Sequence, residues 1–229
     1  GAGIFRLQDH TRRLFDWAKI LGMQITFSME EINAAQKAAV ASNDLDHAYL
    51  GPMVFYGTEG MGLRADALKA HVIVAAWAWG SYMGEENMKR GIKVRTSSYT
   101  RHHVNITMTK AKANGNYMNS MLALQEALTG GADEALLLDP EGYVAEGSGE
   151  NFFIVRDGVI YTPELTSCLD GITRKTIFTL AKEHGLTVIE KRITRDEVLI
   201  ADEAFFTGTA AEVTPIRELD SRPIGAGTR

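Results

Sequence analysis

The segment Glu146-Gly147-Ser148-Gly149-Glu150-Asn151 places two glycines among acidic side chains directly before the apolar run 152–154. It follows Asp139-Pro140-Glu141-Gly142, which is a typical turn sequence. A carboxylate framed by glycines can be approached closely by a flat ligand or by another backbone, and Glu146 could then pair with a protonated ring nitrogen. A polar loop without any ligand explains the same residues. This segment alone therefore leaves a ligand site and a plain loop both open.

Upstream of this segment, two lysines precede a glycine turn in Lys110-Ala111-Lys112-Ala113-Asn114-Gly115-Asn116-Tyr117. If residues 104–112 are extended, as their alternating apolar positions suggest, both lysines point to one face of a strand. A desolvated lysine amine becomes nucleophilic and can form a Schiff base with an aldehyde. A lysine that extends its charge to solvent is the commoner explanation from spacing alone.

The periodicity of apolar residues predicts a mixture of helices and strands. Ser28-Met29-Glu30-Glu31 is a capping-box pattern, and Asp157-Gly158 is typical of a type I′ hairpin turn. Interspersed helices and hairpins favour an α+β class, with the best domain boundary in the glycine-containing loop 80–91. Helices are predicted at 9–21, from 29 to about 41, from Asn116 or Asn119 to Gly130, and at 172–184; strands are predicted at 71–79, 92–99, 134–139, 151–155, 159–162, 187–193 and 203–208.

Composition excludes several classes of protein. The 229 residues are 45% hydrophobic and 23% charged, with a net charge of -5, which is typical of a globular protein and argues against nucleic acid as the main partner. The longest apolar run, 72–79, is too short to span a membrane, and we expect no secretory signal. The single cysteine, Cys168, cannot form an internal disulfide, so we expect a cytoplasmic location and a buried, inert thiol.

Motifs for other chemistries are missing, whereas two segments are suited to anions. The sequence contains no phosphate-binding P-loop, no His-Glu-x-x-His and no Gly-x-Ser-x-Gly. The pair His102-His103 is a poor ligand set, and we predict no metal. Gly171-Ile172-Thr173-Arg174 at a helix start and Gly208-Thr209-Ala210-Ala211-Glu212 after a strand could each offer N–H groups and a threonine hydroxyl to a phosphate or carboxylate.

Taken together and in this order, these segments resemble the fold-type IV pyridoxal-phosphate enzymes, and specifically the branched-chain amino acid aminotransferases. The resemblance implies a small α/β domain at 1–79, an interdomain loop at 80–91 and a larger, mixed β-barrel-like domain at 92–229 that binds pyridoxal 5'-phosphate. Family members begin earlier and end later, so we expect a chain truncated at both ends. The segments that carry the resemblance are 4–7, 12–14, 78–82, 111–117, 146–151, 171–174, 201–203 and 207–212.

The resemblance also assigns roles to residues. Lys112 matches the Schiff-base lysine, which also moves the Cα proton of the substrate, and Lys110 is its unreactive neighbour. Tyr117 matches the tyrosine on the phenolic oxygen of the cofactor, and Glu146 matches the carboxylate beside the pyridine nitrogen. The phosphate site corresponds to Arg6, Ile172, Thr173 and Thr209; the α-carboxylate site to Thr209, Ala210 and Tyr49; and the walls of the side-chain pocket to Trp79 and Tyr82.

The implied reaction moves the amino group of L-leucine, L-isoleucine or L-valine to 2-oxoglutarate, in a homodimer or larger homo-oligomer. One position departs from the family, because Gly51 stands where the family has an arginine near Tyr49. A missing guanidinium removes a bidentate partner worth about 1.5–3 kcal/mol and predicts weaker recognition of glutamate. The alternatives within the fold are a D-amino-acid or (R)-amine transaminase and an aminodeoxychorismate lyase; a non-catalytic homologue is the alternative outside enzymes.

Overall fold

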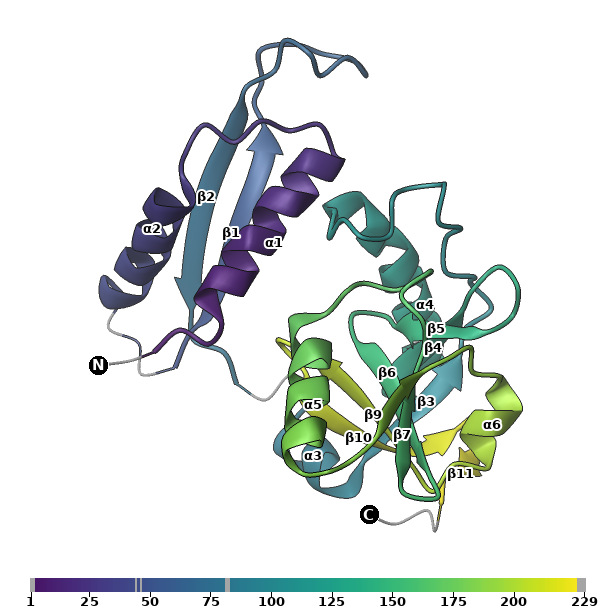
Figure 1. Cartoon of the computed structure of the whole chain (residues 1–229). Coiled ribbons are helices and arrows are strands. Elements are labelled where there is room, and N and C mark those ends of the chain that lie inside the picture. Colours follow the sequence, from purple (N-terminus) through teal and green to yellow (C-terminus); the bar gives the residue numbers. More distant parts are fainter. Residues whose placement is uncertain (1–2, 44, 46, 81–82, 226–229) are drawn as a thin grey trace. The chain divides into compact units, whose positions relative to one another are not determined.

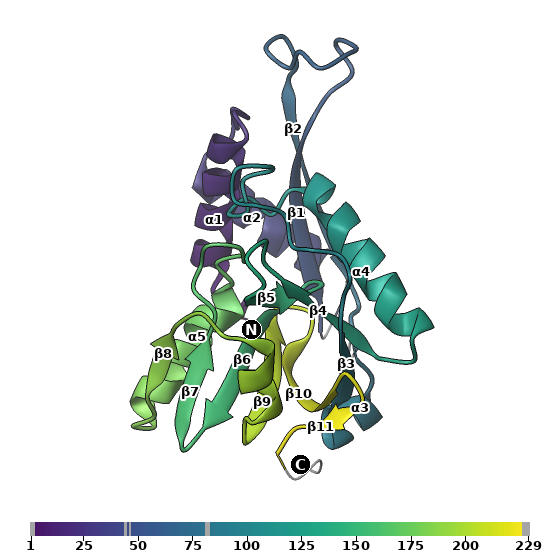
Figure 2. The same ribbon diagram turned by 90° about the vertical axis from the view of Figure 1, so that its right-hand side faces the viewer.

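The computed structural model describes residues 3–43, 45, 47–80 and 83–225, and the chain divides into two compact units, Gly1–Gly80 and Ser81–Arg229. Each unit contains both helices and strands, as the predicted α+β class requires. Figures 1 and 2 show the elements of each unit from two directions. The two units are described separately below.

The first unit is a β-ribbon with two helices lying along it (Figure 1). Helices α1 (Leu7–Ile20) and α2 (Met29–Ala41) precede strands β1 (Tyr49–Tyr56) and β2 (Ala70–Trp77), which pair antiparallel. The predicted capping box is confirmed: Ser28 Oγ accepts from the Glu31 N–H at 3.2 Å, and the Glu31 carboxylate accepts from the Ser28 N–H at 2.7 Å. Both helices lie within about two residues of their predicted bounds.

Polar side chains fill much of the contact between α1 and α2. Thr11 is fully buried; its hydroxyl donates to Asn33 Oδ1 at 2.5 Å and accepts from Gln36 Nε2 at 2.9 Å. Asn33 Nδ2 in turn donates to Gln8 Oε1 at 3.0 Å. Buried polar groups are tolerated when they are hydrogen-bonded, so this interface is specified by paired donors and acceptors rather than by apolar packing alone.

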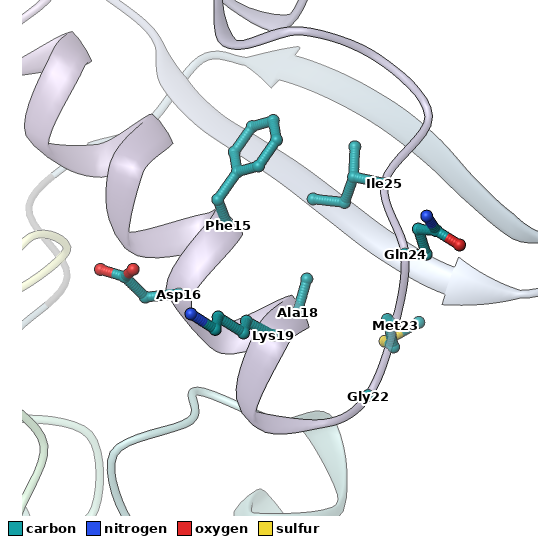
Figure 3. A pocket seen from close by; sticks show the side chains of 8 residues that line it. All are labelled: Phe15, Asp16, Ala18, Lys19, Gly22, Met23, Gln24 and Ile25. Atoms are coloured by element: carbon teal, nitrogen blue, oxygen red, sulfur yellow. The ribbon is translucent and has the colours of Figure 1, made fainter.

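A surface pocket of about 430 Å³ lies beside the end of α1. Figure 3 shows Phe15 on α1 and Ile25 on the segment that follows this helix with their side chains near each other, whereas the side chains of Asp16 and Lys19 extend away from Ile25. None of the residues to which a site role was assigned lines this pocket. Its lining residues are Phe15, Asp16, Ala18, Lys19, Gly22, Met23, Gln24 and Ile25.

The second unit is built on a nine-stranded mixed sheet with strand order β5-β4-β3-β10-β9-β6-β7-β8, to which β11 is added at β10. The pairs β3–β10, β3–β4 and β7–β8 are parallel, and the other pairs are antiparallel. The strands are β3 (Ile92–Thr96), β4 (Glu134–Leu138), β5 (Val144–Gly147), β6 (Asn151–Arg156), β7 (Val159–Thr162), β8 (Val188–Glu190), β9 (Glu203–Gly208), β10 (Glu212–Leu219) and β11 (Arg222–Pro223).

Helices border this sheet and close its apolar core. In Figure 2, α4 (Tyr117–Thr129) lies along β3 and β4, and α5 (Ile172–Glu183) lies beside β6 and β7. The shorter elements are α3 (Glu85–Arg90), α6 (Arg195–Leu199) and the 3₁₀ turn Asn114–Asn116. Phe152 and Phe206 are fully buried in the main core, with their ring centroids 5.6 Å apart on the paired strands β6 and β9.

Two expectations about this unit are wrong. Residues 104–112 form turns rather than a strand, and Met108 has a positive φ of 58°, which breaks the alternation of side chains. Residues 85–90 form helix α3 inside the predicted loop 80–91, with acidic side chains in its first turn and basic ones in its last, as the helix dipole favours. The type I′ turn is confirmed, because Asp157 and Gly158 both have positive φ, 50° and 76°.

The described residues contain no helix with both the length and the apolar character that a membrane span requires.

Candidate active site

The 3₁₀ turn at 114–116 brings two of the predicted site residues into contact. It leads directly into α4, and Tyr117, the first residue of that helix, faces back toward Lys112. The Lys112 amine donates to the Tyr117 hydroxyl and lies 4.8 Å from the centroid of the tyrosine ring. Asn116 Nδ2 donates to the Ala111 carbonyl at 3.1 Å, which fixes the turn between them. An amine and a phenol are thus held side by side.

The structure corrects the argument that burial activates the lysine. Lys112 is exposed, whereas Lys110 is half-buried, and its Nζ donates to the Cys168 carbonyl at 3.3 Å. Burial lowers the pKa of Lys110, the lysine with no assigned reaction. Because the segment is not a strand, the two lysines have different environments rather than a common face. The accessible amine is that of Lys112.

Glu146 lies near the end of β5 and is almost completely buried. Its Oε1 lies 2.7 Å from Arg101 Nη2, and its Oε2 accepts from the Leu169 N–H at 2.9 Å. Burial raises the pKa of Glu146, while the Arg101 charge and the Leu169 N–H oppose that rise by favouring the ionised form. Both oxygens are thereby oriented, and each keeps a lone pair for a further donor.

Arg101 is a site residue that the sequence argument missed. It is buried, and besides contacting Glu146 its guanidinium donates to Asn119 Oδ1 at 3.3 Å and to Ser120 Oγ at 3.2 Å in the first turns of α4. One side chain therefore connects the carboxylate to the helix that carries Tyr117. In the sequence, Arg101 directly precedes His102-His103, and this segment was considered only as a possible metal site.

The start of α5 lies next to this carboxylate. Leu169 connects this segment to two side chains: its N–H donates to Glu146, and its carbonyl accepts from Asn151 Nδ2 at 2.8 Å. A Cβ at Gly171 would lie only 2.0 Å from Asn151 Oδ1, so any larger residue there would displace the Asn151 amide. Ile172 and Thr173 form the first turn of the helix, where backbone N–H groups point outward and favour anions.

The turn between β9 and β10 closes the same region. Thr209 is exposed and Ala210 half-buried at its tip. A Cβ at Gly208 would stand 3.6 Å from the Gly149 carbonyl and from Glu150 Cγ, so this turn packs on the glycine-framed acidic segment. The second unit contains seven of the predicted site residues, and the structure shows direct contact between two of them, Lys112 and Tyr117. The seven are Lys112, Tyr117, Glu146, Ile172, Thr173, Thr209 and Ala210.

The remaining predicted residues belong to the first unit or lie outside the described residues. Arg6 precedes α1 with a positive φ of 50°, and its Nε donates to Asp9 at 2.7 Å. Tyr49 lies against two indoles, its ring centroid being 5.2 Å from that of Trp77 and 4.9 Å from that of Trp79. Tyr82 falls on the residues that the structure does not describe.

Gly51 has a local structural reason. A Cβ at this position on β1 would lie 3.0 Å from Cη2 of Trp77, on the paired strand β2. That separation is tighter than ordinary van der Waals contact, so a side chain at position 51 would require the Trp77 indole to shift by a few tenths of an ångström.

Cys168 is confirmed as an inert thiol. It is buried, its Sγ lies 3.4 Å from the Glu164 carbonyl, and burial raises its pKa to about 12. A thiol with so high a pKa remains protonated at neutral pH and is a poor nucleophile.

Comparison with known proteins decides the family. The amino-transferase class IV family matches residues 1–219. The chain belongs to the class IV aminotransferases. Members of this family are pyridoxal-phosphate-dependent transferases, and the solved relatives include the branched-chain aminotransferase of Thermobaculum terrenum in its PLP form, which has a TM-score of 0.91 and 36% identity and covers 98% of this chain and 73% of that one.

Other relatives in the family match almost all of this chain. The branched-chain-amino-acid aminotransferase of Pseudomonas aeruginosa is 73% identical over 100% of this chain and 75% of its own length. The enzyme of Escherichia coli K12 is 43% identical over 99% of this chain and 74% of its own. A crystal structure of the E. coli enzyme matches 98% of this chain and 74% of that one with a TM-score of 0.96 at 43% identity. These matches confirm the predicted family and fold type IV.

Proposed function

We propose that this aminotransferase moves the amino group of L-leucine, L-isoleucine or L-valine to 2-oxoglutarate, yielding a branched 2-oxo acid and L-glutamate. The observation that carries the choice of substrate is the high identity, over the whole chain, to an enzyme named for branched-chain amino acids. The site supports it with an accessible amine, a neighbouring phenol and a buried, oriented carboxylate.

The residues of the second unit fit pyridoxal 5'-phosphate by the chemistry of their donors. Lys112 would attach the aldehyde carbon, Tyr117 would donate to or accept from the phenolic oxygen, and Glu146 would face the ring nitrogen. The first turn of α5 with Ile172 and Thr173 and the Thr209 hydroxyl would hold the phosphate. The resemblance adds Arg6, a residue of the first unit, to this phosphate site. When bound, this cofactor supplies an electron sink for breaking the Cα–H bond of the substrate.

The chain's own residues then have distinct tasks. Glu146, whose ionised form is favoured by Arg101, would keep a proton on the ring nitrogen of the cofactor. The Lys112 amine would take the proton from the substrate Cα and return it. Tyr117 positions the Lys112 amine, which it already contacts. Thr209 and Ala210 with Tyr49 would bind the α-carboxylate, and Trp79 and Tyr82 would border the apolar side chain.

We further propose that residues 92–229 form the cofactor-binding domain, residues 1–79 a smaller domain that contributes to the substrate pocket, and residues 80–91 the segment between them. A homodimer or larger homo-oligomer in the cytoplasm is part of this proposal. The oligomer is supported by large exposed apolar side chains on helix α4, including Met118, Met121 and Leu122. The cytoplasmic location is supported by the single cysteine. Light scattering of the purified enzyme measures the oligomer directly.

The decisive experiment uses colour, labelling and substrates. The purified enzyme with pyridoxal 5'-phosphate should be yellow, lose that colour with L-leucine, and carry a covalent label on Lys112 after borohydride reduction. Transfer to 2-oxoglutarate should proceed from L-leucine, L-isoleucine and L-valine but not from D-alanine or an (R)-amine. Transfer from D-alanine or the amine alone would replace this proposal with the D-amino-acid or (R)-amine reaction, and a colourless protein would indicate a non-catalytic homologue.

A further inference from the structure

Three carboxyl groups are buried around the segment that carries Glu146. Glu134 on β4 is fully buried, and Glu146 and Glu150 are each only 4% exposed. Arg101 forms an ion pair with Glu146, whereas neither Glu134 nor Glu150 has a cation within ion-pair distance among the described residues. Among the described residues, this group of three acids therefore has a single ion pair, that of Glu146 with Arg101.

Glu134 and Glu150 hold consecutive amides of the glycine-framed segment. Glu134 Oε1 accepts from the Ser148 N–H at 3.3 Å and from the Ala135 N–H at 2.7 Å. Glu150 Oε2 accepts from the Gly149 N–H at 3.0 Å, and the Glu150 carbonyl accepts from the Gly147 N–H at 2.7 Å. A Cβ at Gly147 would lie 2.8 Å from Glu150 Oε2, so the backbone wraps closely around this carboxyl.

One carboxyl oxygen of this pair accepts no hydrogen bond among the described residues, and a bound proton would explain how it can be buried. Glu134 Oε2 is buried and has no hydrogen-bond partner among the described residues, although an ionised carboxylate oxygen without a donor is among the most costly groups to bury. Two neighbouring buried carboxylates repel each other, and one of them retains its proton. In agreement, burial and the Glu134 charge raise the pKa of Glu150 to about 8, and burial raises the pKa of Glu134.

Other charged groups around the pair act on it unequally. Lys112 lowers the pKa of Glu150, and Glu146 raises it. Arg101 and Lys112 lower the pKa of Glu146, and the Cys168 thiol, whose pKa is about 12, is neutral. Among the described residues, the guanidinium in direct contact with this group of acids is that of Arg101, and it is committed to Glu146.

We propose that Glu134 and Glu150 hold one proton between them at neutral pH and serve as positioning residues for Glu146. Their hydrogen bonds fix the Ser148 and Gly149 amides, and so fix the backbone that follows the Glu146 carboxylate. Retaining a proton also leaves Arg101 to Glu146 alone, and this ion pair favours the ionised form of Glu146 against the effect of its burial. Their importance for catalysis rests on the proposed function, in which Glu146 faces the ring nitrogen; the retained proton itself does not.

Infrared spectroscopy tests the retained proton without any assay of activity. At neutral pH the wild-type enzyme, with and without cofactor, should show the carbonyl stretch of a buried neutral carboxylic acid that disappears as the pH rises through about 8. In Glu150→Gln and in Glu134→Gln the remaining acid loses its charged neighbour, so the band should disappear at lower pH in both variants. Glu183→Gln, the same change on an exposed residue of α5, should leave the band as in the wild type.

Kinetics test the positioning role separately. Glu150→Ala should lower kcat with L-leucine by about tenfold to a hundredfold with little change in KM, as a displaced catalytic group does. Glu150→Gln, which keeps a neutral hydrogen-bonding group, should restore most of that kcat. A wild-type spectrum without the neutral-acid band, or a Glu150→Gln variant as slow as Glu150→Ala, would overturn the proposal. If the wild type transfers nothing from any amino acid, the proposed function fails, and the infrared titration still decides the retained proton.

Discussion

Both units bury polar side chains, and they do so in opposite ways. Between α1 and α2, Thr11, Asn33 and Gln36 satisfy one another with short hydrogen bonds. Around β4 and β5, Glu134 retains an oxygen without a partner, and the pKa of Glu150 is raised by burial and by its acidic neighbours. A network in which every donor has an acceptor specifies how two helices pack. A network of buried acids with too few cations shifts the pKa values of those acids, which is typical of functional sites. The comparison predicts that substitutions in the first network change stability alone and that those in the second change activity.

The largest expected effect is at Lys112. Lys112→Ala should reduce transfer from L-leucine by roughly 10⁴-fold, because no other accessible amine is assigned to the site, and it should remove the borohydride label. The measurement is the rate of 2-oxo acid formation together with mass spectrometry of the reduced protein. Lys110→Gln is the matched control, which should still take the label at Lys112. Undiminished transfer by Lys112→Ala would end the assignment.

Glu146→Gln should have the next largest effect. The amide keeps the size of the side chain but loses the charge that faces the ring nitrogen, so kcat should fall by about a hundredfold. The variant also leaves the buried Arg101 without a counter-ion, which lowers the free energy of unfolding. Stopped-flow absorbance with L-leucine measures the first effect and denaturant unfolding the second. A variant that loses stability but keeps its rate would show that Glu146 is only a partner of Arg101.

The pH dependence of stability distinguishes the two networks most directly. The folded pKa of Glu150 is about 8 against an unfolded value of 4.5, so the folded state holds a proton that the unfolded state releases between these values. Stability contributed by this group is therefore fully present below pH 4.5 and is lost as the pH rises from there to about 8. Glu150→Gln should consequently become steadily more stable relative to the wild type across this range, by up to about 5 kcal/mol.

The measurement for Glu150→Gln is urea unfolding at several pH values, with Glu183→Gln unfolded in parallel. The difference between Glu150→Gln and the wild type should grow with pH, whereas the Glu183→Gln curve should follow the wild type. A constant difference across the range would mean that Glu150 is ionised throughout.

Thr11→Val should act on stability alone. Valine keeps the shape of threonine but leaves Asn33 Oδ1 and Gln36 Nε2 without their partner, at a cost of about 1–2 kcal/mol. The specific activity of the folded variant should equal that of the wild type. Urea unfolding measures the expected loss of stability, and a transfer assay on the same sample measures the specific activity. A fall in kcat without a loss of stability would contradict the prediction that the first network affects stability alone.

The smallest effect concerns Gly51. If the family arginine contributes to recognition of glutamate, Gly51→Arg should lower the KM for L-glutamate by at most about tenfold, because a side chain there must first displace the Trp77 indole. Gly51→Ala is the control, since it meets the same indole without a guanidinium. An equal KM for both variants would show that glutamate is recognised by other groups.

Local structure was easier to predict from the sequence than the environment of each side chain. The capping box at Ser28, the hairpin at Asp157-Gly158 and the bounds of α5 depend on short-range patterns, and the structure contains them. The segment 104–112 was misjudged because its apolar alternation imitates a strand, while the positive φ of Met108 has no such signal. Strands β1, β5, β10 and β11 went without prediction, although each pairs antiparallel with a strand next to it in the sequence. Their sequences contain glycine or proline, residues that are uncommon inside strands and that weaken the periodic signal.

The site shows the same limit. Resemblance named Lys112, Tyr117 and Glu146, and the structure places Lys112 against Tyr117. It did not name Arg101, which lies far from Glu146 in the sequence and meets it only in the folded chain. Glu134 and Glu150 were equally hidden, because the sequence does not distinguish a carboxyl that is buried without a cation from one on the surface. Burial, rather than residue type, distinguishes them.

The loop before Lys112 is anchored on its N-terminal side. Thr109 Oγ1 donates to the Thr166 carbonyl at 3.2 Å, and Lys110 Nζ donates to the Cys168 carbonyl, so the backbone is attached to the strand-to-helix connection that ends at α5. The side chain of Lys112 has four flexible methylene groups, and it starts from a backbone that these two hydrogen bonds hold in place. The Lys112 side chain can therefore turn about its own bonds while the main chain stays in place, and shortening Lys110 would remove one of the two hydrogen bonds that hold this main chain.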